Sequence, residues 1–485
     1  MTDWFRVDKE GLGRQAAEFP KGRLIAELIQ NSLDETGVTM IEVRLNPIPG
    51  KPFAEVMVGD DSPEGFRNLA HAYTLYADSY KATDPTKRGR FNLGEKLVLA
   101  LCRRATITTT KGRVEFSPMD GRVELRHKRE KGSVFIGEIR MTREECQQAG
   151  AYLRTLLIPS GVLVVFNDGI LPSRKPLHAF TADLSTLVAD EDGIMRERTR
   201  QTTIRVYEPT PGEVATLYEL GLPVVETGDK WHVDIGQRVP LNRDRDNVKP
   251  SFLAKVRTLV VNEMHDRLAE DDANQTWVRQ ASASPDCSQQ ATGRILDLRF
   301  GEKRVAYDPS DPEANKAAVA QNYTVVHGGM MHRQEWTNAK AAGAIRPAGK
   351  VCPTAKPYSD DPNAPPADIL PQDEWTPGMH RIVAYARFLA RQLMDVQLTV
   401  TIVRAGMNFS ACYGKGGRLD LNLKRLGHRF FDEPNRASIT RLLIHEFGHE
   451  YSGDHLSEAY HDALCDLGAK LLELALSQPK DFPKL

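Results

Sequence analysis

The chain lacks the features that mark a secreted, membrane-spanning or strongly basic protein. Its 485 residues contain no long apolar run that could span a bilayer, and residues 1–6 lack a signal-peptide core. Lysine plus arginine number 64 and aspartate plus glutamate 65, so the formal net charge of −1 gives no global basic surface for nucleic acid. We therefore expect a cytoplasmic protein with no membrane partner, and nucleic acid is not indicated as a partner.

Cysteine is scarce as well, and no Cys-x-x-Cys pair is present. Scattered cysteines of this kind are expected to be reduced thiols in a cytosolic protein. Cys465, near the C-terminus, is predicted to be a small core residue. The six cysteines are Cys102, Cys146, Cys287, Cys352, Cys412 and Cys465.

Length and composition predict several folded domains. Hydrophobic residues make up 41% of the chain and charged residues 27%, as in soluble globular proteins, and 485 residues suffice for about three domains. Eight prolines between positions 347 and 377 predict a stiff linker before the last domain. An amphipathic helix is expected to open that domain, within residues 375–396.

The most informative segment is Ile444-His445-Glu446-Phe447-Gly448-His449. On a helix, positions i and i+4 share a face, so His445 and His449 can hold one Zn²⁺ while Glu446 points at the water that the metal polarises. Apolar residues at helical spacing place the two histidines on a buried helix, with Asp432 as an expected N-cap.

A third metal ligand is expected just after this helix. A catalytic zinc takes three protein ligands and leaves one position open. His455 follows a glycine turn and is the first choice, and Glu458 is the alternative. Upstream, residues 418–423 alternate polar and apolar and predict an edge strand that could pair with an extended peptide.

These C-terminal residues resemble the zincin metallopeptidases, the His-Glu-x-x-His family, over roughly the last hundred residues. The spacing of His455 is similar to that of the metzincin branch, with two departures: Ser452 stands where that branch has its glycine, and no methionine follows His455. The resemblance implies metal-assisted amide hydrolysis of a protein or peptide substrate, with Glu446 as the catalytic base.

The N-terminal part carries a different set of polar residues. Glu27, Asn31 and Asp34 fall at i, i+4 and i+7 on one face of a predicted helix. A predicted strand then ends in Gly59-Asp60-Asp61-Ser62-Pro63-Glu64-Gly65, and a carboxylate there could accept a hydrogen bond from adenine. Farther on, the glycines of segment 87–96 precede an apolar helix, whose N-terminus favours phosphate.

In this order the three segments resemble the GHKL ATPases, the group of gyrase, the ninety-kilodalton heat-shock chaperone, histidine kinases and MutL. The resemblance implies Glu27 as the base that activates water, with ATP and Mg²⁺ as cofactors. Pro63 and Asn92 are departures, because the family motifs have glycine at these positions. The resemblance also implies nucleotide or magnesium contacts by the following residues: Asn31, Asp34, Asp61, Gly65, Gly89, Gly94, Lys96 and Thr108.

The fold class expected from these patterns is α+β and multidomain. Residues 1–170 are predicted to form a Bergerat-type α/β sandwich that binds nucleotide, and residues 171–270 a transducer-like α/β domain, in which Lys249 is a weak candidate for a phosphate contact. Residues 271–373 comprise a region of uncertain role and the proline-rich linker. Residues 374–485 are predicted to form a zincin-like, mainly helical domain.

Two functions remain open at this point. In the first, ATP binding closes or dimerises the N-terminal domains and so gates a zinc peptidase. In the second, a GHKL clamp or chaperone-like remodeller carries a structural or binding zinc domain, and Glu458 or Asp454 completes a four-ligand site. A third function, the handling of DNA as in mismatch repair, rests only on an analogy of fold. Whether ATP is hydrolysed or only sensed at Glu27 is open as well.

Overall fold

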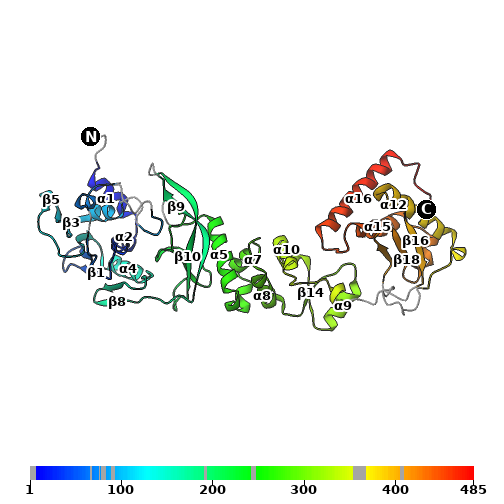
Figure 1. Cartoon of the computed structure of the whole chain (residues 1–485), viewed down its shortest axis with the longest axis horizontal. Helices are drawn as coiled ribbons and strands as arrows, with labels where there is room; N and C mark the ends of the chain where they lie inside the picture. Colours follow the sequence, from blue (N-terminus) through cyan, green and yellow to red (C-terminus); the bar gives the residue numbers. More distant parts are fainter. Residues whose placement is uncertain are drawn as a thin grey trace. The chain divides into compact units, whose positions relative to one another are not determined.

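The computed structural model describes residues 7–65, 68–75, 77, 84–88, 93–190, 194–241, 247–352, 368–404 and 409–485. It divides into two compact units, residues 1–267 with 275–281, and residues 268–274 with 282–485. Both units combine helices with sheets, so the chain is α+β and multidomain, as expected (Figure 1). Among the described helices, none combines the length and apolar character needed to cross a membrane.

The first unit begins with an eight-stranded sheet of order β5-β4-β3-β6-β2-β1-β7-β8. Strands β1 and β7 are parallel, and the other neighbours are antiparallel. Alternating burial along β1 and β2 gives the sheet one apolar face, which packs against helices. The strands are β1 (Met40–Pro47), β2 (Phe53–Asp60), β3 (Cys102–Thr108), β4 (Arg113–Ser117), β5 (Gly121–Leu125), β6 (Val134–Arg140), β7 (Leu163–Phe166) and β8 (Gly169–Leu171).

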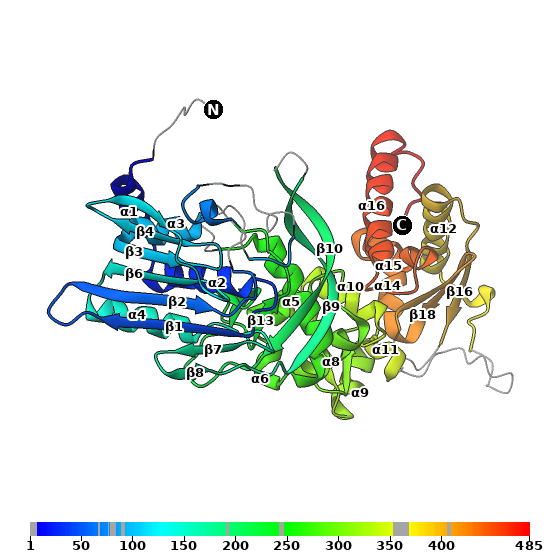
Figure 2. The same ribbon diagram turned by 60° about the vertical axis from the view of Figure 1, so that its left-hand side comes forward.

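Helices cover that apolar face, and α2 and α4 lie along the strands β1 and β2 (Figure 2). Helix α2 has an almost continuous buried stripe, which includes Leu24, Ile25, Leu28 and Ile29. This burial anchors the helix, on which Glu27 and Asn31 are half-buried outside the stripe. The helices are α1 (Lys9–Ala17), α2 (Lys21–Leu33), η1 (Leu69–Ala72), α3 (Gly94–Leu101) and α4 (Arg143–Arg154).

A second sheet of the first unit has the order β12-β11-β13-β10-β9. Its strands β9 and β10 form a long antiparallel hairpin, against which α5 packs (Figure 2). The elements are β9 (His178–Ala189), β10 (Met195–Tyr207), β11 (Thr216–Glu219), β12 (Leu222–Glu226), β13 (His232–Ile235), α5 (Pro250–Met264), η3 (His265–Arg267) and α7 (Thr276–Ser282).

The second unit starts with a small helical part around a two-stranded parallel sheet. We refer to residues 282–352 as the middle module. Its core is an apolar cluster that includes Leu296, Phe300, Val326 and Ile345. The elements of this part are α6 (Glu270–Ala273), α8 (Gln289–Phe300), β14 (Arg304–Ala306), α9 (Pro312–Ala320), β15 (Thr324–Val326), η4 (Gly328–Met330), α10 (Arg333–Ala341) and α11 (Ala348–Val351).

The C-terminal part of the second unit packs helices on a three-stranded sheet of order β16-β18-β17. Its opening helix α12 confirms the amphipathic helix expected from the sequence. The elements are η5 (Gln372–Glu374), α12 (Pro377–Met394), β16 (Thr399–Val403), β17 (Ala411–Gly414), β18 (Arg418–Asn422), α13 (Leu423–Leu426), α14 (His428–Asp432), α15 (Arg436–Phe447), η6 (Gly448–Glu450) and α16 (Glu458–Ser477).

Three local expectations are wrong. Strand β18 is central, because it pairs with β16 on one side and β17 on the other, so β17 is the strand at that edge. Asp432 ends α14, and Asn435 caps α15 by accepting the Ser438 N–H at 3.0 Å. Cys465 is exposed on α16 and does not belong to the core.

Candidate functional site

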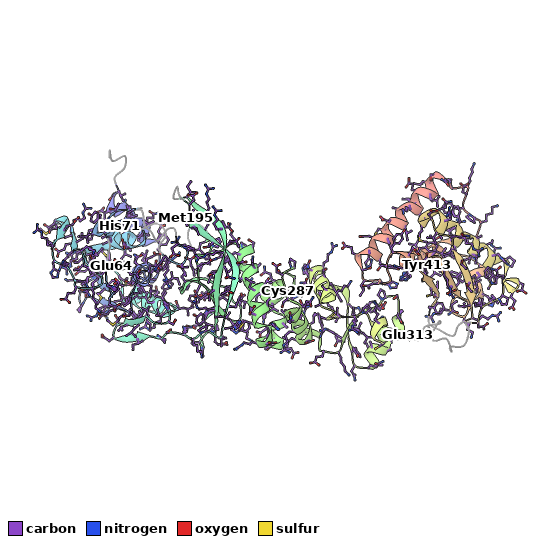
Figure 3. All side chains as sticks on the ribbon, in the orientation of Figure 1. Glu64, His71, Met195, Cys287, Glu313 and Tyr413 are labelled. Carbon is purple, nitrogen blue, oxygen red and sulfur yellow. The ribbon has the colours of Figure 1, made fainter. Side chains whose placement is uncertain are left out.

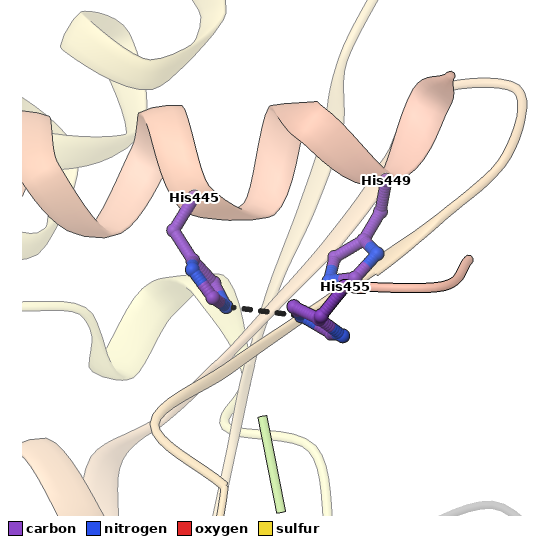
Figure 4. A group of neighbouring side chains, drawn as sticks. All are labelled: His445, His449 and His455. Atoms are coloured by element: carbon purple, nitrogen blue, oxygen red, sulfur yellow. Dashed lines mark hydrogen bonds between the residues drawn. The ribbon is translucent and has the colours of Figure 1, made fainter. Parts of the chain in front are cut away.

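Helix α15 and the 3-10 turn η6 carry the two histidines of the His-Glu-x-x-His segment. Ile439, Leu443 and Phe447 are buried along α15, and this packing fixes the rotation of the helix about its axis. His445 lies on the last turn of α15 and His449 on η6, so the helical course continues past Phe447. The two imidazoles therefore project from the same side, with ring centroids 5.8 Å apart (Figure 4).

His455 reaches the same place from the loop between η6 and α16. The Ser452 hydroxyl accepts the Asp454 N–H at 3.1 Å, and the Asp454 carboxylate accepts the Leu456 N–H at 3.0 Å. These bonds shape the turn that carries His455 back toward the helix. Its Nε2 lies 3.3 Å from the Nε2 of His445 (Figure 4). The ligand atoms of all three histidines lie within 4.8 Å of one another, so the group could hold a metal ion.

Hydrogen bonds at the backs of two rings set their tautomers. His449 Nδ1 lies 3.1 Å from the Ser452 carbonyl, which can only accept, so Nδ1 carries the proton. The Tyr460 hydroxyl donates to the His445 carbonyl at 2.9 Å and therefore accepts from His445 Nδ1 at 3.0 Å. Both rings thus keep the lone pair on Nε2, the form in which an imidazole binds metal.

The three imidazoles are also biased toward the neutral state. Burial lowers the pKa of His445 and of His449 below the ordinary value. Burial, with the neighbouring His449 and His445, lowers the pKa of His455 to about 4. At neutral pH the three rings are therefore free of protons on one nitrogen each, as metal binding requires.

Glu446 follows His445 in α15 and is buried. Only 6% of the residue is exposed, and burial raises the pKa of Glu446 to about 7 although the Tyr413 backbone N–H donates to its carboxylate. Tyr413, labelled in Figure 3, belongs to β17, one of the two edge strands of the three-stranded sheet. A carboxylate whose pKa is close to neutral can exchange protons readily at physiological pH.

The alternative metal ligands are engaged elsewhere. Glu458 forms an ion pair with Arg333 of the middle module. Asp454 accepts a backbone hydrogen bond in its own loop. Among the residues that the structure describes, the group found to be able to hold a metal consists of His445, His449 and His455.

The middle module holds the loop of His455 in place. Leu456, the residue after His455, packs against the apolar cluster of this module, as Trp336 and Ala344 also do. The Lys340 ammonium donates a hydrogen bond to the Leu456 carbonyl. The third histidine of the group is thus positioned by residues more than a hundred positions earlier in the chain.

In the N-terminal unit, Glu27 and Gly94 are brought into contact. Gly94 begins helix α3, and a Cβ at Gly94 would lie 2.3 Å from Oε2 of Glu27. Glycine is therefore needed for the close approach of this helix N-terminus to the carboxylate, which the helix dipole favours. Gly89, the other glycine predicted to meet phosphate, lies outside the described residues.

Asn31 and Lys96 meet at a buried carboxylate. Asn31 Nδ2 donates to Glu95 Oε2 at 3.0 Å, and the Lys96 ammonium forms an ion pair with the same carboxylate. Lys96 also donates to the His71 carbonyl, and only 4% of the residue is exposed. Lys96 is thus directed to partners within the protein, so a phosphate contact by this side chain would require it to turn.

Asp34 is fully buried and serves as an anchor for the segment 84–88. Its Oδ2 accepts the Arg88 backbone N–H at 2.8 Å, and its Oδ1 lies 3.1 Å from the Arg88 guanidinium. Arg88 Nε donates to the Leu220 carbonyl at 2.9 Å, between β11 and β12. Asp34 therefore supports the fold around the candidate nucleotide site through contacts with protein.

The two aspartates at the end of β2 have different surroundings. Asp61 caps the start of β1, because its carboxylate accepts the Thr39 and Met40 N–H groups at 2.8 and 2.9 Å. Asp60 is buried and faces α2, where the Ser32 hydroxyl donates to it at 3.4 Å. The inward carboxylate is thus Asp60, one position before the predicted contact Asp61. The signal was available, since adjacent strand residues point to opposite faces.

The remaining candidates are placed as follows. Gly65 has a φ of +60°, and a Cβ there would lie 3.0 Å from the Gly132 carbonyl, so glycine allows this loop to close on β6. Thr108 ends β3 and is half-buried, paired with Val134. Lys249 forms an ion pair with Glu197 at 2.7 Å on the exposed hairpin. Tyr460, which no sequence signal distinguished, belongs to the histidine site.

Comparison with known proteins gives little beyond this geometry. No protein-family model and no curated protein sequence matches the chain. One similar solved structure is the ATPase region of topoisomerase II from Saccharomyces cerevisiae, with 10% identity, a TM-score of 0.30, and 42% of this chain and 62% of that chain covered. Another is the N-terminal domain of a DNA repair protein, with 12% identity, a TM-score of 0.28, and 49% and 90% covered. The present chain thus spans 62% of the topoisomerase region.

Proposed function

We propose that the C-terminal part of the chain is a zinc-dependent peptidase. The observation that carries this proposal is the convergence of His445, His449 and His455 within 4.8 Å. Two nitrogen ligands of one tetrahedral zinc are about 3.3 Å apart, given Zn–N distances of about 2.0–2.1 Å. The 3.3 Å between Nε2 of His445 and Nε2 of His455 fits this spacing.

The chain's own residues then divide the work of amide hydrolysis. His445, His449 and His455 hold the metal through nitrogen atoms, and Tyr460 and the Ser452 carbonyl orient two of the rings. A zinc ion, when bound, lowers the pKa of a coordinated water to near neutrality. Glu446, with its pKa raised to about 7, accepts a proton at its carboxylate and can return it to the leaving amine.

Loss of the Glu446 carboxylate tests the proposal. Glu446→Gln should leave zinc content unchanged and lower the cleavage of β-casein on the order of 10²- to 10⁴-fold, the usual contribution of a general base. Glu458→Gln is the matched control, since Glu458 is exposed and paired with Arg333. Equal cleavage by the parent and by Glu446→Gln would refute the peptidase.

We further propose that the N-terminal unit binds ATP with Mg²⁺, and that nucleotide binding gates the peptidase. Support comes from the cluster of Glu27, Asn31 and Glu95 at the N-terminus of α3, where anions are favoured. In this account Asn31 is the magnesium ligand, Glu27 is the base in hydrolysis, and the buried Asp60 accepts the adenine amine. A nucleotide-dependent homodimer is the expected assembly.

The pair of adjacent aspartates gives a test of nucleotide binding. Asp60→Asn should weaken binding of a fluorescent ATP analogue about tenfold or more, because a hydrogen bond to a charged group is lost. Asp61→Asn is the control, as this side chain caps β1. Unchanged binding in Asp60→Asn, or no binding by the parent, would contradict the proposal, and casein cleavage with and without ATP would test gating.

A further inference from the structure

A cavity of about 680 Å³ borders the loop that carries His455. Asp454 and Leu456, the residues on either side of His455, form one wall of it. The middle module forms the other walls, which are apolar at Trp336 and Ile345. This volume lies within the range of about 300–1,000 Å³ that is usual for ligand sites.

The cavity carries an excess of positive charge. Lys340, Arg346 and Lys350 line it, and all three are exposed. Its one acidic residue, Asp454, is turned to the Leu456 N–H at 3.0 Å. Within the described ranges, neither Arg346 nor Lys350 forms an ion pair. Two cations at the cavity wall therefore have no countercharge from these parts of the protein.

The cavity is close to the histidine group along the chain. Asp454 and Leu456, which flank His455, both line it. Gly349 lines it as well, and its N–H donates to the Asp308 carboxylate at 3.2 Å. A chain that enters the cavity therefore lies beside the loop that carries His455.

We propose that this cavity receives acidic side chains of the peptide substrate, so that the peptidase selects peptides rich in aspartate or glutamate near the cleaved bond. The inference rests on the proposed function and names its substrate class. Carboxylates would pair with Arg346 and Lys350, while Trp336 and Ile345 cover the aliphatic part of the side chain.

Peptide binding to a Glu446→Gln protein tests this without cleavage. The probes are a fluorescein-labelled peptide of alternating glutamate and alanine and the same peptide with glutamine, measured by fluorescence anisotropy in the zinc-loaded protein. The glutamate peptide should bind more tightly. The double variant Arg346→Gln/Lys350→Gln should weaken its binding about tenfold, since two exposed charge pairs are lost. Lys340 is left intact because it holds the Leu456 carbonyl.

A second double variant controls for a general loss of positive charge. Lys316→Gln/Arg391→Gln removes two exposed cations that lie outside the cavity and pair with Glu313 and Asp395. It should bind the glutamate peptide like the parent. Equal weakening in both double variants, or equal binding of the two peptides, would overturn the proposal. If cleavage fails but cavity-dependent binding is found, only the peptidase is refuted, and the reverse result refutes only the acidic preference.

Discussion

The two candidate sites of this chain differ in where their polar groups point. At the C-terminal site, one ligand nitrogen of each of the three imidazoles lies within 4.8 Å of the other two. The Nδ1 atoms of His449 and His445 form hydrogen bonds with the Ser452 carbonyl and the Tyr460 hydroxyl. At the N-terminal site, Lys96 and Asp34 are turned to partners within the protein. The ligand atoms of the first site therefore already lie close together, whereas Lys96 and Asp34 at the second site would have to move to contact a ligand.

This difference follows from how each site is assembled. The histidine group comes from α15, the turn η6 and the loop that follows, within residues 445–455. The helical spacing of His445 and His449 therefore places these two rings on one side. The candidate nucleotide site joins α2, the end of β2 and the start of α3. Preorganisation of a site reduces the ordering cost of binding, so we expect zinc to bind with little rearrangement.

Removal of one histidine should give the largest effect. His449→Ala should weaken zinc binding on the order of a hundredfold or more, because about 10–16 kcal/mol of zinc binding shared by four ligands is roughly 3 kcal/mol for each. The measurement is competition with a chromophoric chelator. His461→Ala is the control, as His461 is exposed on α16 and outside the group. Stoichiometric zinc at parent affinity in His449→Ala would contradict the assignment.

The hydroxyl of Tyr460 should matter next. Tyr460→Phe keeps the ring but removes the acceptor for His445 Nδ1, so the zinc affinity should fall about 10- to 100-fold, as for other residues that orient metal ligands. Tyr451→Phe serves as the comparison, since Tyr451 is 47% exposed. If the two variants bind zinc equally well, the orienting role of Tyr460 is wrong.

The anchor of the His455 loop should have a smaller effect. Leu456→Ala removes packing against the middle module and should lower the zinc affinity about tenfold. Because Leu456 is partly buried, the free energy of unfolding should fall by roughly 2 kcal/mol. Leu472→Ala, at a leucine that is 62% exposed on α16, should change neither quantity. Parent-like zinc affinity in Leu456→Ala would show that the loop holds His455 without help from the module.

His232, in the first unit, is a buried histidine outside the candidate metal group, and its effect on stability at different pH values can be compared with that group. His232 is buried between Thr216 and Glu213: its Nδ1 accepts the Thr216 N–H at 3.1 Å, and its Nε2 lies 3.2 Å from Glu213. Burial lowers the pKa of His232 below 6.5 although Glu213 opposes this. The folded state therefore binds the proton less readily than the unfolded state, so stability is full above pH 6.5 and falls as the pH decreases.

This loss should appear as the pH falls from 7 to 5.5, because the unfolded state then takes up the proton. Hydrogen exchange of β13, corrected for the intrinsic rate, should show protection falling over this range in the parent and less in His232→Gln. Glu213, whose pKa is held low by Arg174, should add to the loss only at more acidic pH. An identical pH dependence in the variant would contradict the role of His232.

Local sequence patterns predict several helices and the spacing of two histidines. Features that depend on contacts between residues far apart in the sequence could not be predicted in this way. The i, i+4 spacing of His445 and His449 and the amphipathic helix α12 follow from periodicity alone. Periodicity does not decide between His455 and Glu458, because Glu458 is bonded to Arg333, which lies 125 positions earlier in the chain. Strand β18 shows alternating polarity although it is central, since Asp420 and Asn422 are buried within the fold. Asp60 and Asp61 differ by one step of strand register, which a motif does not resolve.

In the proposed site, three histidines hold one zinc ion and leave one position open to solvent. X-ray absorption at the zinc edge of the purified protein tests it most directly, before and after addition of a small hydroxamate. We predict three imidazole nitrogens and one solvent oxygen at about 2.0–2.1 Å, with the solvent ligand replaced on hydroxamate binding. A sulfur ligand, a fourth protein ligand that hydroxamate leaves in place, or the absence of zinc would contradict the account.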